Sequence, residues 1–258
     1  MLEKAFTAAV AAAFFAGGVS NAAASQRYET VYHAPTRVNL GGRPVTADIK
    51  LASDRAAAEN GYALLVLITD VTDFIADVET DLEKWVAAHQ DECGQRWKAG
   101  KPVIDFPDGA IRFALDLELD VYHCGWNGKS DPALLTSETG SVSATLTPSA
   151  VDGRLQAALS DFSIGNRGGV SKYLPLEFVT RAIIEQEIKK LNENPKFYKA
   201  PLPFADEGFG YAGIKGRTNK HGRVIIIAHY STKGDAAKVA RVVERVRAEG
   251  ISAEGVKQ

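Results

Sequence analysis

The stretch IRFALDLELDVY, residues 111–122, decides the fold of this chain. Its large apolar side chains occupy every second position: Ile111, Phe113, Leu115, Leu117, Leu119 and Val121. Charged or aromatic residues fill most of the positions between them. Because successive side chains of a strand point to opposite faces, this alternation predicts a strand with one buried and one solvated face. At about 3.3 Å per residue, such a strand is longer than about 30 Å.

Shorter strand patterns occur on both sides of this stretch. Apolar residues alternate over residues 45–51, and residues 62–69 form a continuous apolar run that predicts a strand covered on both faces. Residues 142–146 and 155–159 also alternate, and the Asp152-Gly153 dipeptide between them predicts a hairpin turn. A second hairpin is predicted around the turn-rich tetrad at residues 219–222.

Three helices are predicted among these strands. The first is expected to start at Thr80, because Thr80 and Glu83 form a capping-box pattern, and to continue as far as Trp97. Pro175 suits the first turn of the second helix, which is expected to end near Asn192. The third covers residues 237–249, with valines toward the core and basic residues outward.

These elements predict the fold class. Strands joined by hairpins are neighbours in an antiparallel sheet, and the helices alternate with them without a low-complexity linker. We therefore predict a single α+β domain over residues 25–258. In it a long, curved, largely antiparallel sheet wraps one or two helices, and a C-terminal amphipathic helix closes the chain.

The second helix has a wider apolar surface than contact with one sheet requires. The apolar side chains of its first two turns are Leu176, Phe178, Val179, Ala182, Ile183 and Ile184. At about 100° per residue they span about 240°, whereas a helix on one sheet needs a stripe of somewhat over about 100°. A second layer of the same fold or a bound apolar molecule has to cover the excess. We take Phe178, Val179 and Ile183 as candidate ligand-binding residues that line an apolar cavity.

Residues 1–24 are predicted to be a cleavable signal peptide. Lys4 supplies a positive start, residues 5–19 are small or apolar and uncharged, and Ala22 and Ala24 provide a cleavage site before Ser25. The apolar run is shorter than the about 20 residues that span a bilayer as a helix, so an uncleaved anchor is the less favoured alternative. The sequence therefore predicts a periplasmic or secreted protein with no stable transmembrane anchor after cleavage.

The two cysteines, Cys93 and Cys124, are predicted to form a disulfide, because an even pair in an exported chain is most simply a disulfide. Zinc is the alternative, since His89 and His123 are near them in the sequence. Zinc requires all four ligands within about 2.0–2.3 Å of one point, while neighbouring strand residues such as His123 and Cys124 point to opposite faces. We therefore expect a disulfide and no metal site.

The motifs of common enzyme classes are absent from the sequence. It contains neither a Gly-x-Ser-x-Gly elbow nor a His-Glu-x-x-His helix, and the glycine-rich residues 165–169 lack the Lys-Ser/Thr of a P-loop. Asp116, Glu118 and Asp120 share one face of the long strand, and a solvated outer face explains them better than a cation or acid–base site. A net charge of −2 provides no reason to expect nucleic acid as a partner. We expect no cofactor and assign no catalytic residue.

An apolar segment at residues 195–204 combines prolines with Phe197, Tyr198, Leu202 and Phe204. Such a rigid segment usually packs over the end of a core. A lid on an apolar cavity is the alternative.

The order of elements between residues 140 and 232 adds a family resemblance. A hairpin with an Asp-Gly turn ends in SDFSI at residues 160–164, the Leu174-Pro175-Leu176 helix start follows, and a long helix then leads to another hairpin. In element order and apolar pattern this resembles the tubular lipid-binding superfamily, also called TULIP or BPI-like. In that family a curved antiparallel sheet wraps a long helix around an apolar groove. The resemblance implies periplasmic binding or transport of a lipid or another apolar small molecule.

Two other functions remain open. An exported hydrolase would need a carboxylate or histidine site without a known motif, and clustered carboxylates with raised pKa values would favour it. A cell-envelope interaction protein without a ligand would need only an exposed sheet edge or the basic final helix. A cavity distinguishes lipid binding from the second of these.

Overall fold

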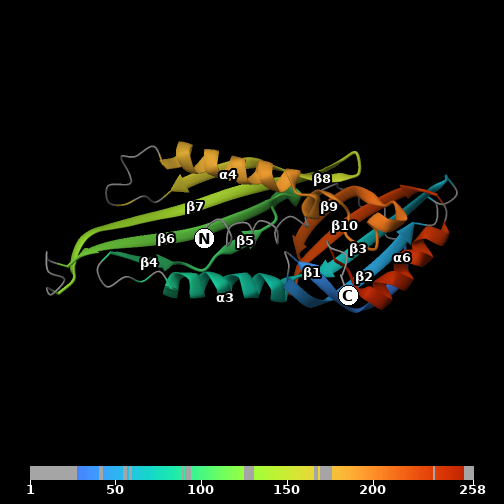
Figure 1. Cartoon of the computed structure of the whole chain (residues 1–258), viewed down its shortest axis with the longest axis horizontal. Helices are drawn as coiled ribbons and strands as arrows, with labels where there is room; N and C mark the ends of the chain where they lie inside the picture. Colours follow the sequence, from blue (N-terminus) through green and yellow to red (C-terminus); the bar gives the residue numbers. More distant parts are fainter. Residues whose placement is uncertain are drawn as a thin grey trace.

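The structure, a computed structural model, describes residues 28–40, 43–54, 57, 60–88, 90, 94–124, 131–165, 168, 176–234 and 236–252. The predicted signal peptide, residues 1–24, lies outside this part of the chain. Figure 1 shows an elongated molecule in which two sheets follow one another along the long axis.

The first sheet combines strands from both ends of the described chain, in the order β1-β2-β3-β10-β9. Its strands are β1 (Tyr28–Leu40), β2 (Arg43–Asp54), β3 (Tyr62–Asp70), β9 (Gly210–Thr218) and β10 (Val224–Lys233). Each ladder between these neighbours is antiparallel. β2 contains the predicted alternation at residues 45–51, and β9 and β10 form the hairpin predicted around residues 219–222.

β3 has apolar neighbours on both faces, as its continuous apolar run predicts, but only one face is fully buried, because Leu64 and Ile68 on the other face are half-buried. Leu65 and Leu67 belong to the main core, whereas Val66 packs with Ala52 and Ile227 in a smaller cluster on the other face. The helix α6 (Ala236–Glu249) also packs on the main core, which contains Val239, Val242, Val243 and Val246. The predicted C-terminal amphipathic helix is thereby confirmed.

The second sheet consists of β4 (Gln95–Ala99), β6 (Ile111–His123), β7 (Ala133–Val151) and β8 (Arg154–Gly165), in that order. The short β5 (Val103–Asp105) also pairs with β6, and η1 (Pro107–Gly109) connects the two. The predicted long strand at residues 111–122 is β6. Asp152 and Gly153 have φ values of 51° and 75°, as the tight turn between β7 and β8 requires.

The α+β fold with largely antiparallel sheets is confirmed, and the strands are divided between two open sheets. The sheets meet where the β7–β8 turn contacts the start of β9. The Tyr211 N–H donates to the Gly153 carbonyl at 2.9 Å. Ile111 and Leu155 of the second sheet are buried in the main core beside the first sheet. The main core therefore extends across the junction between the sheets.

The first predicted helix begins and ends elsewhere. α3 (Thr72–Ala88) contains Thr80 in its interior, where the hydroxyl donates to the Ala76 carbonyl at 3.2 Å. The capping box at Thr80 and the helix through Trp97 were therefore wrong predictions. Asp70 provides the start instead, since its Oδ1 accepts the Thr72 N–H at 3.0 Å. Trp97 lies in β4 opposite Leu119 of β6, because pairing with a distant strand overrides the helical spacing.

Residues 195–204 pack over the end of the core, as the favoured interpretation holds. α5 (Pro195–Tyr198) opens the segment, and η3 (Ala205–Glu207) follows it. Phe204 is fully buried, and its ring stacks on Tyr230 with the centroids 4.4 Å apart.

The second predicted helix is α4 (Leu176–Glu193), which ends before Pro195 as expected. It packs along the second sheet, where its buried Ile184, Ile188 and Leu191 form a separate cluster with β7 and β8. In the part of the chain that the structure describes, none of the helices combines the length and the apolar character needed to cross a bilayer.

Candidate functional site

The second sheet has one polar and one apolar face. Residues directly opposite each other in neighbouring strands share a face. Asp116, Glu118 and Asp120 of β6 lie opposite Ser141, Thr139 and Ser137 of β7, so this face carries carboxylates and hydroxyl groups. On the other face, Leu115 lies opposite Val142, which in turn lies opposite Ile164 of β8.

The three acidic residues of β6 share the polar face, as predicted, but they are not equally solvated. Asp116 is exposed, whereas Asp120 is only 6% exposed. Lys98 of β4 pairs with both Glu118 and Asp120, the latter at 3.0 Å. Hydrogen bonds from Ser137 and then Lys98 lower the pKa of Asp120, and the bonds to Glu118 and Asp120 raise the pKa of Lys98. Asp120 is therefore held as a charged partner of Lys98, which does not suit a general acid at neutral pH.

α4 closes part of the apolar face. Ala144, Leu146 and Phe162 of the sheet pack against Ile184 and Ile188 of the helix, and all five side chains are buried. The Asn192 side chain fixes the helix on the edge strand β8. Its Oδ1 accepts the Ala157 N–H and its Nδ2 donates to the Ala157 carbonyl, both at 2.8 Å.

Along β6 the same face remains partly open. We call this set of side chains the apolar strip: Phe113, Leu115, Leu117, Leu119 and Val121. Each is only half-buried, and none belongs to the buried clusters of the described residues. Trp97 and Ala99 of β4, opposite Leu119 and Leu117, are also half-buried. The apolar face is therefore fully buried beneath α4 at Ala144, Leu146 and Phe162, and only half-buried along β6 and β4.

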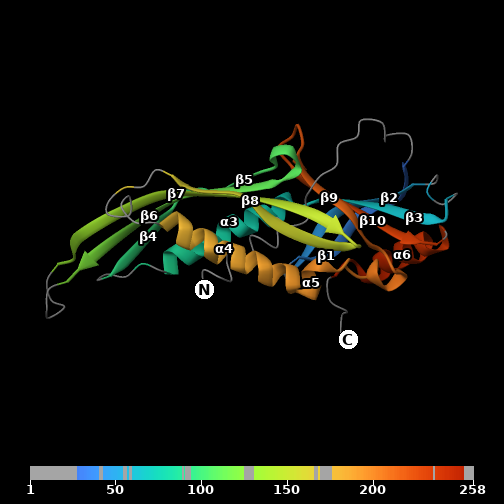
Figure 2. The same cartoon turned by 90° about the horizontal axis from the view of Figure 1, so that it is seen from above.

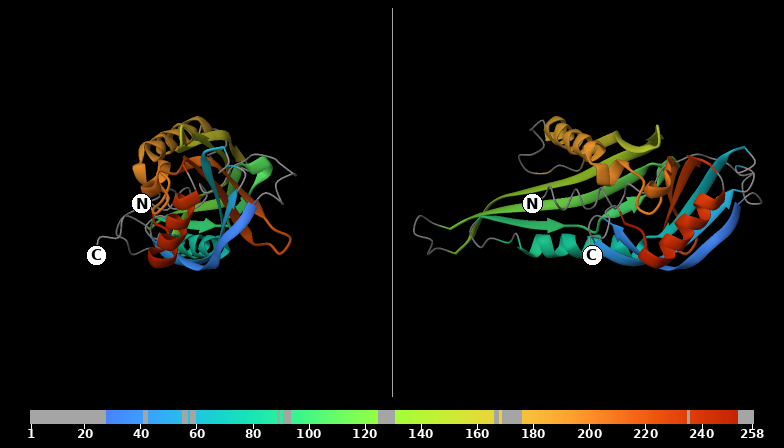
Figure 3. Two further views of the ribbon diagram at one scale, coloured as in Figure 1. Left: turned by 90° about the vertical axis from the view of Figure 1, so that its right-hand side faces the viewer. Right: turned by 45° about the vertical axis from the view of Figure 1, so that its right-hand side comes forward.

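Two helices border the apolar strip. Figures 1 and 2 together place α4 along β7 and β8 and α3 along β4, on the same side of the second sheet. In both views of Figure 3 the two helices remain apart, with strands of the sheet between them. The strip thus runs between two helices that approach it from opposite edges of the sheet.

The predicted ligand-binding residues belong to α4, one of these two helices. The backbone of α4 is described throughout, but the side chains of Phe178, Val179 and Ile183 lie outside the described part of the molecule. Their contact with a ligand stays a prediction. The apolar strip was not selected from the sequence, although the alternation at residues 111–121 is the signal that contains it.

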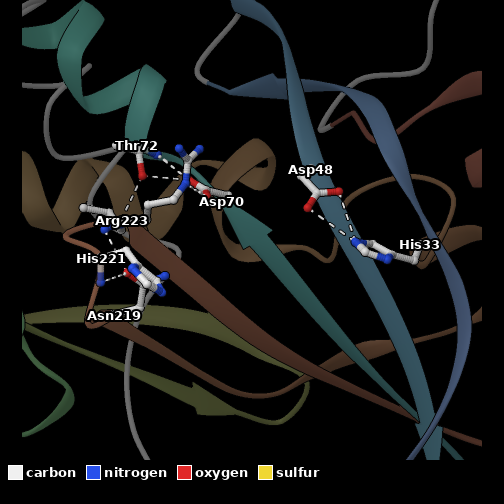
Figure 4. A network of polar contacts seen from close by, with 8 residues as sticks. His33, Asp48, Asp70, Thr72, Asn219, His221 and Arg223 are labelled. Carbon is white, nitrogen blue, oxygen red and sulfur yellow. Dashed lines mark hydrogen bonds and ion pairs between the residues drawn. The ribbon is translucent and has the colours of Figure 1, made fainter.

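Hydrogen bonds and an ion pair connect the start of α3 to the β9–β10 hairpin, as Figure 4 shows. We call the four residues that make them, Asp70, Thr72, Asn219 and Arg223, the polar joint. The Thr72 hydroxyl donates to Asp70 Oδ1 at 2.7 Å and accepts the Val224 N–H at 2.9 Å. Arg223 pairs with the other Asp70 oxygen. Asn219 Oδ1 accepts the Arg223 N–H at 3.0 Å and thereby shapes the turn that presents Arg223. The joint aligns the start of α3 and is structural in character.

The pKa of Asp70 reflects this joint. Burial raises the pKa of this carboxyl, but hydrogen bonds from Arg223 and Thr72 outweigh that effect, and the net shift is downward. Figure 4 also shows His33 and Asp48, whose side chains pair at 3.2 Å on the outside of β1 and β2. Both are more than half exposed, so this pair lacks the enclosure of a catalytic dyad.

The cysteine and metal predictions fall partly outside the described residues. Cys124 at the end of β6 is disulfide-bonded, whereas Cys93 and His89 belong to the part of the chain that is not described. Among the described side chains, no group of three or more His, Cys, Asp and Glu residues could hold a metal ion. The pairing of Cys124 with Cys93 stays a prediction.

A hollow lies between α6 and strands β1 to β3. It has a volume of about 500 Å³, within the range of small-molecule sites. Its apolar lining includes Val31, Val239 and Val243, and its charged lining consists of three carboxylates and one guanidinium, those of Glu29, Asp54, Glu244 and Arg247. This mixture selects no single ligand chemistry.

Comparison with known proteins adds no further constraint, since no protein-family model, curated protein or solved structure matches the chain.

Proposed function

We propose that this protein binds a lipid or another elongated apolar molecule along the apolar strip of the second sheet. The observation that carries the proposal is the half-buried state of five large apolar side chains on one strand, on a face bordered by two helices. In the same molecule one face of β3 is fully buried, since Ala63, Leu65 and Leu67 are 6% exposed or less.

The strip is long enough to hold an acyl chain along its whole length. Phe113 to Val121 span eight residue steps, or about 26 Å at about 3.3 Å per residue. The hydrocarbon core of a bilayer is about 30 Å thick and contains two leaflets, so one acyl chain occupies about half of that length. Full burial of an exposed leucine or phenylalanine side chain contributes about 1.5–3 kcal/mol. Completing the burial of each half-buried side chain of the strip contributes a fraction of that, and the sum over five side chains provides affinity without a polar anchor.

The hydrolase alternative receives less support. Clustered carboxyl groups with raised pKa values would favour it, but the shifts resolved at Asp70 and Asp120 are both downward. The pKa of His229 is lowered by burial and then by the charge of Lys215, and no carboxylate contributes to its shift. The resemblance to the tubular lipid-binding superfamily agrees with lipid binding and, like periplasmic localisation, remains a prediction.

Two variants of neighbouring residues test the proposal. Leu115→Asn places an amide on the apolar strip, while Asp116→Asn makes a change on the polar face of the same strand. We expect native protein to bind a fluorescent fatty acid saturably, Leu115→Asn to weaken binding about tenfold or more, and Asp116→Asn to leave it unchanged. Absence of saturable binding by native protein across a broad lipid panel would refute the proposal, as would equal losses in the two variants.

A further inference from the structure

The apolar face of the second sheet changes character along β7. Six residues of β7 share this face with the apolar side chains of β6, in order from the β7–β8 turn: Leu146, Ala144, Val142, Gly140, Glu138 and Thr136. The three nearest the turn are apolar, whereas the two farthest from it carry a carboxylate and a hydroxyl. Glu138 lies directly opposite Leu119 and Thr136 opposite Val121, and both are half-buried. The apolar strip therefore has a polar border at its Val121 end.

The other end of the strip has apolar neighbours on both sides. Phe113 lies between Ile104 of β5 and Ala144 of β7, which are its partners across the sheet. Polar groups are costly to place among such side chains unless they are hydrogen-bonded. An elongated molecule with one polar end would therefore lie with its hydrocarbon end at Phe113 and its polar head beside Glu138.

Glu138 and Thr136 offer a ligand hydrogen-bond acceptors but no donor. The Thr136 hydroxyl donates its one hydrogen to Glu138 Oε1 at 3.0 Å. The carboxylate only accepts, and the hydroxyl oxygen can accept as well. Gln95 flanks Val121 from β4, but it is exposed and its amide both donates and accepts, so it does not discriminate between head groups. The strip at Glu138 thus complements a head that donates hydrogen bonds.

We infer that Glu138 selects the head group of the bound molecule, and that this head is a hydrogen-bond donor, a primary ammonium or a hydroxyl, rather than a carboxylate or a phosphate. An ammonium forms charge-assisted hydrogen bonds with a carboxylate, which are about twice as strong as neutral ones. A ligand carboxylate would instead bring a like charge to half-buried Glu138, where repulsion is screened less than in water. The inference rests on the proposed function, because it assigns the polar head of the molecule whose chain the strip would hold.

The strip is long enough for this orientation. Leu119 to Phe113 span six residue steps, or about 20 Å at about 3.3 Å per residue. One acyl chain occupies about half of the hydrocarbon core of a bilayer, which is about 30 Å thick. A molecule with its head at Glu138 can therefore place such a chain entirely along the apolar side chains of β6.

The test compares decylamine, decanol and decanoate, which share a chain and differ in the head, by isothermal titration calorimetry at pH 7 and low ionic strength. We expect native protein to bind decylamine about tenfold or more tightly than decanoate, with decanol between them. Decanoate still binds through its chain.

Two variants assign this preference. Glu138→Gln preserves the shape of the side chain and an oxygen for the Thr136 hydroxyl, but it removes the charge and adds a donor. The ratio of the decanoate and decylamine dissociation constants should therefore approach one. Asp116→Asn is the matched control, since it removes the same charge from the polar face of the same sheet, and it should keep the native ratio.

Failure of the inference and failure of the proposed function give different results. Saturable binding that Leu115→Asn weakens, but without a preference for the amine, overturns the inference and leaves the proposed function standing. The inference is also overturned if the preference survives in Glu138→Gln, which would assign it to another residue. Equal loss of the preference in Asp116→Asn overturns it too, because the net charge of the protein would then be the cause. Absence of saturable binding of all three probes overturns both.

Discussion

At the scale of single residues, Asp70 connects three elements. It follows β3, accepts two hydrogen bonds from Thr72 at the start of α3, and pairs with Arg223 before β10. Its side chain is 14% exposed, so the pair is screened less than a surface ion pair. The position of α3, and with it one border of the apolar strip, depends on this carboxylate.

Asp70→Asn should lower the free energy of unfolding at pH 7 by about 1–2 kcal/mol, because the amide loses the ion pair and weakens the helix cap. The pKa of Asp70 is depressed in the folded protein, so its contribution is present above the unfolded pKa of about 3.9 and is lost as the pH falls through the folded value. Denaturant titrations from pH 7 to pH 2 should therefore show a smaller acid loss of stability in the variant. Asp48→Asn, at a carboxylate that is 61% exposed, is the control and should be nearly neutral. If Asp70→Asn lost as much stability between pH 7 and pH 2 as the native protein does, this role of Asp70 would be contradicted.

At the scale of elements, α4 and β6 differ in how completely their apolar side chains are covered. Ile188 of α4 is 5% exposed against β7 and β8, whereas Leu115 of β6 is half-buried on the same face of the sheet. A polar substitution should therefore affect stability at Ile188 and ligand binding at Leu115.

Ile188→Asn should destabilise the protein by about 3 kcal/mol or more, since it removes buried packing and leaves an amide without partners. Leu115→Asn should cost clearly less, because water can reach its amide. Chemical denaturation of both variants measures the difference, with Lys189→Asn, at the exposed neighbour of Ile188, as the control for the helix. If Ile188→Asn and Leu115→Asn lowered the free energy of unfolding equally, the apolar strip would be part of the buried core.

At the scale of the whole molecule, the two sheets are joined through a backbone contact at Gly210. A Cβ atom at Gly210 would lie 2.8 Å from the Gly153 Cα and 2.9 Å from the Gly153 carbonyl oxygen. Both are backbone atoms of the turn between β7 and β8, which cannot move without shifting the second sheet against the first.

Gly210→Ala should therefore lower the free energy of unfolding by about 1–3 kcal/mol through overpacking at the junction. Gly213→Ala is the control on the same strand, where a Cβ meets no atom within 4 Å, and it should be nearly neutral. Thermal melts of the two variants measure the difference. Similar melting temperatures for both would show that the junction adapts without cost.

Much of the local structure was predictable from the sequence because it depends on near neighbours. Alternation at residues 111–121 predicts β6, and the Asp152-Gly153 dipeptide predicts the turn after β7 because Gly, and Asp more rarely, adopt positive φ. The valines of α6 at helical spacing predict both the helix and its buried face. These patterns are also sufficient for the α+β class and for antiparallel pairing.

Tertiary structure alone decided three further features. β9 and β10 belong to the first sheet and not to the second because β10 pairs with β3, a strand far from it in the sequence. Trp97 lies in a strand because β6 offers it a partner, although its spacing suits a helix equally well. The apolar side chains of β6 follow the same alternation whether or not a helix covers them. How far they are buried depends on the positions of α3 and α4, and long-range packing determines those positions.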